Sequence, residues 1–207
     1  MYSWTTSQCE RLWNDLVALA KDPEGGGHFV GSIVYIEGGL YQVTTIPRLL
    51  LIDGQQRLTT ISLLLCALSN HMTENALDSQ VKSETIRNYY LVNREEDGDL
   101  RYKILLTNAD RAHYVRLING DITTDPDPEN LLVRNYRLFL RKLADKKLSP
   151  DEVYQAINRL EVVDISLDRR YDDPQLIFDS LNSTGLDLSE PDRIHAILRC
   201  QSIQVDF

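Results

Sequence analysis

Residues 52–60 read I-D-G-Q-Q-R-L-T-T and mark the point at which a short apolar run gives way to a long helix. The run before this motif, Leu49-Leu50-Leu51-Ile52, is typical of a buried strand. From residue 54 to about residue 71, apolar side chains cover most of the helical circumference, which predicts a central, buried helix. Asp53 is expected to cap this helix, with Gln56 three residues later completing a capping box.

Strand and helix patterns surround the motif. Residues 29–37 and 41–46 are rich in Val, Ile, Tyr and Thr and are separated by Gly38-Gly39, which predicts two strands and a tight turn. Apolar and polar side chains alternate along residues 161–167, which predicts a return strand. Residues 102–106 are expected to form a further short strand. Helical spacing predicts helices over residues 7–21, 81–92, 108–119, 131–147, 150–160, 174–182 and 189–200. We therefore expect an α+β fold, with a small mixed sheet and the buried helix in residues 1–75. A mostly helical part would follow in 76–160, and a return strand with the last helices in 161–207.

Composition excludes several classes of function. The chain has 207 residues, 22 Lys plus Arg and 31 Asp plus Glu, so its formal charge is −9, which disfavours a chain that holds DNA by itself. It has no apolar run of membrane-spanning length and no signal-peptide pattern at its start, so we expect a cytoplasmic protein without a membrane partner. Its three cysteines and four histidines are scattered, and no metal-ligand set is predicted.

The motif that opens the long helix allows two interpretations. In the first, Asp53 and Gln56 are capping residues and Arg57 lies on a surface turn. In the second, the helix N-terminus from Gly54 onward presents free backbone N–H groups to a phosphate. Arg57 then adds a charged fork, Gln55 and Gln56 add amide donors, and Asp53 orients Arg57 or a metal-bound water. Under this second interpretation Arg57 is a surface residue whose loss weakens binding and leaves stability nearly unchanged.

A second polar segment lies near the end of the chain, at residues 177–192. Gly185 is a plausible left-handed end for one helix, and Ser189 with Asp192 is a capping pattern for the next. Asn182 stands at the end of the first of these helices, where its amide can reach a ligand. If the two segments share a function, Asn182 and Arg57 must line one cleft.

The two segments, taken in this order, resemble the N-terminal domain of GmrSD-type, modification-dependent (type IV) restriction endonucleases. Gly31-Ser32-Ile33-Val34 leading into residues 52–60 is similar to the family's first motif. Residues 178–192, with the pattern F-x-x-L-N-x-x-G-x-x-L-x-x-x-D, are similar to its second. Tyr2 and Trp4 match the end of a family pattern, Q-R-x-Y-x-W, whose Gln and Arg are missing here. His195 and Ala196 replace a basic residue and an Asn that the family tends to show.

The resemblance implies a fold with a ParB/sulfiredoxin-like core. It also implies a nucleotide-binding regulatory domain of an antiphage restriction system, with or without NTP hydrolysis. It implies a nucleoside triphosphate of unspecified base as the cofactor, with Mg²⁺ as a candidate companion. Asp53 and Arg57 are the implied catalytic residues, and Gly54, Gln55, Gln56, Arg57 and Asn182 the implied nucleotide-binding residues. The implied partner is an HNH nuclease domain or subunit supplied elsewhere, so this domain would act on DNA only indirectly. Whether the chain forms a homo-oligomer is left open.

Three alternatives remain. The first is a non-catalytic nucleotide- or DNA-binding module without turnover, which the missing Gln-Arg pair and the residues at 195 and 196 favour. The second is a sulfiredoxin-like redox enzyme, which needs a cysteine beside the phosphate-binding arginine, whereas position 56 is Gln and Cys66 lies in an apolar stretch. The third is a ParB-like DNA-binding role, which the charge of −9 disfavours.

Overall fold

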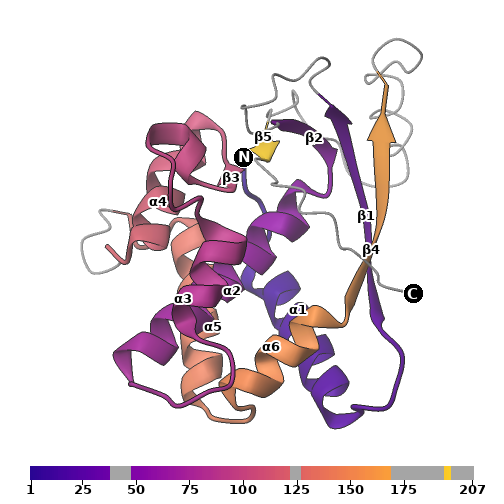
Figure 1. Cartoon of the computed structure of the whole chain (residues 1–207), viewed down its shortest axis with the longest axis vertical. Helices are drawn as coiled ribbons and strands as arrows, with labels where there is room; N and C mark the ends of the chain where they lie inside the picture. The colour runs from indigo at the N-terminus through magenta and orange to yellow at the C-terminus, as the bar shows by residue number, and fades with distance from the viewer. Residues whose placement is uncertain (38–47, 122–126, 169–193, 197–207) are drawn as a thin grey trace.

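The computed structural model describes residues 1–37, 48–121, 127–168 and 194–196. Six α-helices, two short helices of other types and five strands occur in these ranges (Figure 1). The helices are α1 (Thr6–Lys21), α2 (Gln55–Glu74), α3 (Ser83–Ile86), the π-helix η1 (Arg87–Leu91), the 3₁₀-helix η2 (Gly98–Arg101), α4 (Asn108–Asn119), α5 (Leu131–Ala144) and α6 (Pro150–Asn158). The strands are β1 (His28–Glu37), β2 (Leu49–Asp53), β3 (Ile104–Leu105), β4 (Leu160–Leu167) and β5 (Ile194–Ala196).

The strands form one mixed sheet in the order β3-β5-β2-β1-β4. β1 pairs antiparallel with β2 and parallel with β4, while β5 pairs antiparallel with both β2 and β3. The register of β1 against β4 shifts between Phe29 and Ser32, and Gly31 within this irregularity has a φ of +114°. The predicted α+β class with a small mixed sheet is confirmed.

The main core lies between the sheet and the helical layer that covers one of its faces (Figure 1). Helix α2 runs through this core, and Leu63, Leu64 and Leu68 on it are fully buried, as the apolar pattern predicts. The alternation of β1 sends Ile33 into this core, while Val34 faces a smaller apolar cluster on the opposite face of the sheet. The return strand expected near residues 161–167 is β4.

The connector between α1 and β1, which carries Gly25-Gly26-Gly27, is held in place by a single arginine. Arg159, just after α6, donates hydrogen bonds to the carbonyl oxygens of Leu19, Asp22, Gly25 and Gly26 at 2.7 to 2.8 Å. A guanidinium carries five donors in a fixed plane, which suits it to several carbonyls at once. The spacing between α1 and β1 is therefore fixed at this end by Arg159.

Several predicted elements differ from the structure. The helix expected over residues 81–92 is a four-residue α-helix followed by the π-helix η1. The helix expected over residues 189–200 is wrong at Ile194–Ala196, which pair with β2 and β3 as β5. Apolar runs of this length fit a helix or a strand equally well, and pairing partners distant in the sequence decide between them. The predicted strand 41–46, the Gly38-Gly39 turn and the helix 174–182 lie outside the described residues.

Candidate functional site

The start of α2 has a different cap from the predicted one. The N-cap is Gly54, which adopts the left-handed conformation with φ of +88° and makes no side-chain cap, so the capping box from Asp53 to Gln56 is not formed. A Cβ at Gly54 would lie 3.0 Å from the carbonyl oxygen of Ser32 and 3.2 Å from the Cα of Ile33. A glycine at this position therefore allows both the turn from β2 into α2 and the close approach of that turn to β1.

The carboxylate of Asp53 points forward to Arg57 instead. Arg57 Nη2 donates to Asp53 Oδ2 at 2.8 Å and to the carbonyl oxygen of Ser32 on β1 at 2.6 Å. The Arg57 side chain is only 25% exposed, and its Nε is buried without a hydrogen-bond partner in the described part of the chain. Arg57 is therefore a partly buried residue that links α2 to β1 and not the surface arginine that the sequence predicts, while the small effect of its loss on stability stays a prediction.

Gly31 makes room for this guanidinium. A Cβ built at Gly31 would lie 2.8 Å from Arg57 Nη1 and 3.0 Å from its Cζ. The irregularity of β1 at this residue lets the strand pass beneath the arginine with no side chain in the way. The G-S-I-V and D-G-Q-Q-R segments therefore meet in space, at Arg57.

The two glutamines of the motif bind backbone groups in this structure. Gln56 accepts from the N–H of Ser3 at 2.9 Å and donates to the carbonyl of Met1 at 3.1 Å. Gln55 Nε2 donates to the carbonyl of Leu51 at 2.9 Å. Both glutamines therefore have a structural role in addition to the one predicted in nucleotide binding. Gln56 fixes the first residues of the chain against α2.

The first residues of the chain are tied into the helical layer by buried polar groups that sequence reasoning did not single out as functional. The hydroxyl of Tyr2 lies 2.7 Å from Thr60 Oγ1 and accepts from Asn135 Nδ2 at 3.0 Å. Asn135 also donates to the carbonyl of Trp4 at 2.7 Å. Burial raises the pKa of the Tyr2 phenol well above its usual value, which keeps it a neutral hydrogen-bonding group. In the sequence, Asn135 stands out as a lone amide on the apolar face of a predicted helix, which is the pattern that could have indicated its buried role.

Arg57 and the anchored Trp4 both line a pocket of about 390 Å³ between α1 and β1. Pockets of this size hold small-molecule ligands in other proteins. Two of the lining residues, Asp15 of α1 and His28 of β1, approach each other, with 3.4 Å between Asp15 Oδ2 and His28 Nε2. The lining residues are Trp4, Gln8, Arg11, Leu12, Asp15, His28, Phe29, Val30, Arg57 and Ile61.

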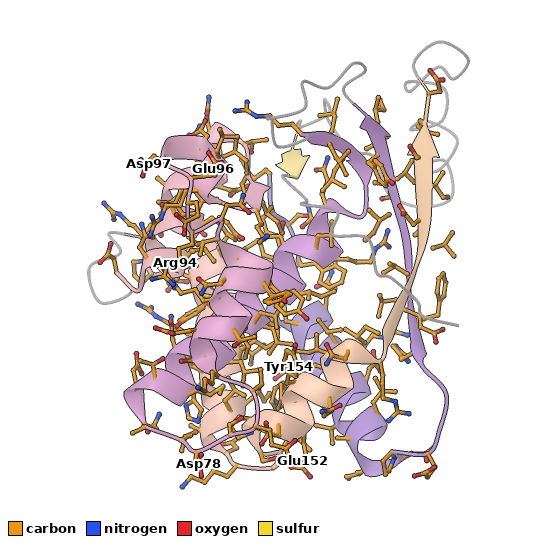
Figure 2. The ribbon with its side chains drawn as sticks, in the orientation of Figure 1. Asp78, Arg94, Glu96, Asp97, Glu152 and Tyr154 are labelled. Carbon is orange, nitrogen blue, oxygen red and sulfur yellow. The ribbon has the colours of Figure 1, made fainter. Side chains whose placement is uncertain are left out.

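Part of the acidic charge of the chain lies away from this pocket. Figure 2 shows Asp78, Glu96, Asp97 and Glu152 on the helical side of the molecule, at a distance from β1 and β4. The pocket itself holds two arginines, Arg11 and Arg57, against one carboxylate. Arginines thus outnumber carboxylates among the lining residues, although Asp53, which is not a lining residue, pairs with Arg57.

A family model described as the GmrSD restriction endonuclease, N-terminal domain, matches residues 1–199. The chain belongs to this family. The match confirms the family indicated by the two motifs and assigns the chain to a domain of a restriction system. No curated protein matches the chain.

The GmrSD N-terminal domain described here has no reactive thiol in its described part. Cys66 is fully buried on α2 and donates from its sulfur to the carbonyl of Leu117 at 3.3 Å. Burial raises the pKa of the Cys66 thiol to about 12, so it is not a thiolate near neutral pH. Cys9 is also buried, and burial raises its pKa too. Neither of these two thiols is therefore a good nucleophile in this structure, while Cys200 lies outside the described residues.

The remaining predicted site residue, Asn182, lies outside the described residues of this GmrSD domain. Its convergence with Arg57 on one cleft therefore stays a prediction. In the described part, no helix has both the length and the apolar character needed to cross a membrane.

Proposed function

We propose that this chain is the nucleotide-binding regulatory domain of a modification-dependent restriction system and that Arg57 holds the phosphates. The observation that carries the proposal is the hydrogen bonding and burial of the Arg57 guanidinium. Its Nη2 is bonded to Ser32 and Asp53, while its buried Nε has no partner in the described chain and the side chain lines the pocket. Such a group is held in place before a ligand arrives and retains donors that an anion would satisfy.

Other residues of the pocket fit a nucleotide. Arg11 supplies a second positive charge, and Trp4 and Phe29 offer aromatic surfaces for a base. Gly54 and the N–H groups that follow it are not among the lining residues, so the positive end of the α2 dipole would act on a ligand only from outside the pocket. In this arrangement Gln56 positions Trp4 through the backbone of residues 1–4, and Asn182 would approach from the second motif.

Asp53 acts on Arg57 rather than on a metal in this geometry. Its carboxylate receives the Arg57 Nη2 donor at 2.8 Å, and a salt-bridged carboxylate is a weaker ligand for Mg²⁺. Among the described residues that line the pocket, only Asp15 is acidic, and it lies beside His28. Mg²⁺ would therefore reach this site mainly with the phosphates, and the chemistry it supplies is neutralisation of their charge.

Nucleotide binding without turnover is the second candidate function. Hydrolysis needs a group that orients a water at the terminal phosphate. Asp53, the described carboxylate nearest to Arg57 in the sequence, is already paired with it. Under this alternative, binding alone would regulate an HNH nuclease domain or subunit, and a second copy of the chain is a further candidate partner.

Calorimetric titration with ATP, GTP, CTP and UTP in the presence of Mg²⁺ tests the proposal. One charge-assisted hydrogen bond contributes roughly 1.5–3 kcal/mol, so Arg57→Ala should weaken binding about 10- to 100-fold. Arg134→Ala is the matched control, because Arg134 on α5 pairs with Glu129, which precedes that helix, and Arg134 is not a lining residue. Equal affinity of wild type and Arg57→Ala, with both shown to be folded at the titration temperature, would remove Arg57 from the site. A phosphate-release assay on the same samples separates binding from hydrolysis.

A further inference from the structure

Two side chains of opposite charge, Asp15 and Arg57, line the pocket at different positions along β1. Helix α1 and strand β1 run side by side in opposite directions (Figure 1), joined by the connector that Arg159 holds. Asp15 of α1 meets His28 of β1 at one end, and Arg57 lies over Gly31 at the other. Gly31 follows His28 by three positions along β1, which places the two groups about 10 Å apart.

The length of α1 agrees with this estimate. Gln8 precedes Asp15 by seven helical residues, which is also about 10 Å along the helix axis. Gln8 is thus level with the Arg57 end, and Arg11 lies between the two ends. The middle of the pocket is apolar, because Leu12 and Ile61 line it. A ligand that fits must be anionic at one end, flat and apolar in the middle, and rich in hydrogen-bond donors at the other end.

The donor-rich end is defined by the Asp15 carboxylate. A carboxylate only accepts hydrogen bonds, and its two oxygens suit two parallel donors best. His28 Nε2, 3.4 Å from Asp15 Oδ2, holds that carboxylate towards the β1 side of the pocket.

Among the nucleobases, guanine alone presents two adjacent donors, N1–H and the 2-amino group, on its pairing edge. Adenine has one donor beside one acceptor there, cytosine has one donor followed by two acceptors, and uracil places its single N–H between two carbonyl oxygens, which a carboxylate repels. Resting on the proposed function, we propose that this pocket selects guanine nucleotides, with Asp15 accepting from the base and Arg57 donating to the phosphates. Arg57 then contributes to the affinity for every nucleotide, because it binds the phosphates that all nucleotides share. Asp15 determines which base is preferred.

Substituting Asp15 by asparagine tests the assignment, because the base can be changed to match. Xanthine carries a carbonyl where guanine has its 2-amino group, so an amide at position 15 can donate to it. We expect wild type to bind GTP more tightly than ATP or XTP by on the order of tenfold or more. Asp15→Asn should lose that preference and favour XTP over GTP by a similar factor. ITP, which lacks the 2-amino group, should bind wild type with intermediate affinity.

Glu10→Gln is the matched control, since it removes the same charge from the same helix at a residue that pairs with Lys142 and does not line the pocket. It should leave every preference unchanged. Wild type that binds GTP, ATP and XTP alike, or Asp15→Asn that keeps the preference for GTP over XTP, would overturn the assignment of the base while leaving the phosphate site at Arg57 intact. Failure of every nucleotide to bind wild type would overturn the proposed function and this assignment together.

Discussion

Replacing Gly31 by alanine should disrupt the site through Arg57. Gly31 has a φ of +114°, which an alanine adopts only with strain. The new methyl group would also lie 2.8 Å from Arg57 Nη1, a distance at which one of the two must move. Gly31→Ala therefore acts twice, once on the backbone of β1 and once on the guanidinium above it.

The two costs can be separated. The backbone cost is about 1–2 kcal/mol for a residue forced to positive φ. Moving the guanidinium breaks its bonds to Ser32 and Asp53, which are 2.6 and 2.8 Å long. The Arg57 and Asp53 side chains are 25% and 35% exposed, so each bond is discounted for solvent screening to about 0.5–1 kcal/mol. Gly31→Ala should lower the free energy of unfolding by roughly 2–4 kcal/mol in total.

A double-mutant cycle with Arg57→Ala isolates the second cost. In the Arg57→Ala background the displaced group is absent, so Gly31→Ala should cost only about 1–2 kcal/mol, and the coupling should be about 1–2 kcal/mol. Urea unfolding, followed by the fluorescence of Trp4 and Trp13, measures all four proteins. Gly120→Ala is the control for backbone strain, because Gly120 has a φ of +87° and open space around its missing Cβ.

Additive effects, within about 0.5 kcal/mol, would refute this account of Gly31 and Arg57. A cost of Gly31→Ala equal to that of Gly120→Ala would do the same, because it would leave no contribution from the guanidinium. Nucleotide affinity should follow the same pattern, with Gly31→Ala weakening binding in the presence of Arg57 and having no further effect in its absence.

Two further predictions concern residues that support the pocket, and a third concerns the start of α6. Asn135→Ala should lower the free energy of unfolding by about 2–3 kcal/mol in urea titrations and weaken nucleotide binding, because two buried hydrogen bonds are lost and Trp4 is released. Arg159→Lys should destabilise the α1–β1 connector, seen as faster hydrogen exchange there, because one ammonium cannot reach four carbonyls. Hydrogen bonds from Ser79 and from the Gln80 and Val81 backbone hold the pKa of Asp151 below its ordinary 3.8. This stabilisation is present above pH 3.8 and is lost as the pH falls through the lower folded value, so the destabilisation caused by Asp151→Asn should be full at pH 7 and should diminish as the pH is lowered below 3.8.

The amino-acid pattern predicts much of the fold because local periodicity is strong here. The buried helix after Gly54 is confirmed as α2, and the apolar residues before Asp53 are confirmed as β2. Residues 108–119 form α4 with the predicted bounds. Each of these elements has its own hydrophobic period or punctuation, which a window of neighbouring residues contains in full.

The errors arise where the partner is distant in the sequence. Residues 194–196 follow a helical pattern but pair with β2 and β3. Asp53 has the side chain of a typical helix N-cap, but Gly54 is the N-cap and the Asp53 carboxylate accepts a hydrogen bond from Arg57. In both cases a local preference worth a fraction of a kcal/mol to about 1 kcal/mol was outweighed by tertiary contacts.

For the candidate site, the sequence by itself determined the motif, its place at the start of a buried helix and the family to which the chain belongs. Tertiary structure alone decided that Arg57 is half-buried over Gly31 and that Trp4 is anchored by Asn135, 131 residues away. It also decided that Asp15 and His28 lie at the opposite end of the pocket from Arg57. The physical reason is that helical spacing and capping act over a few residues. A pocket, by contrast, depends on how α1, α2 and β1 pack together, and no stretch of neighbouring residues records that packing.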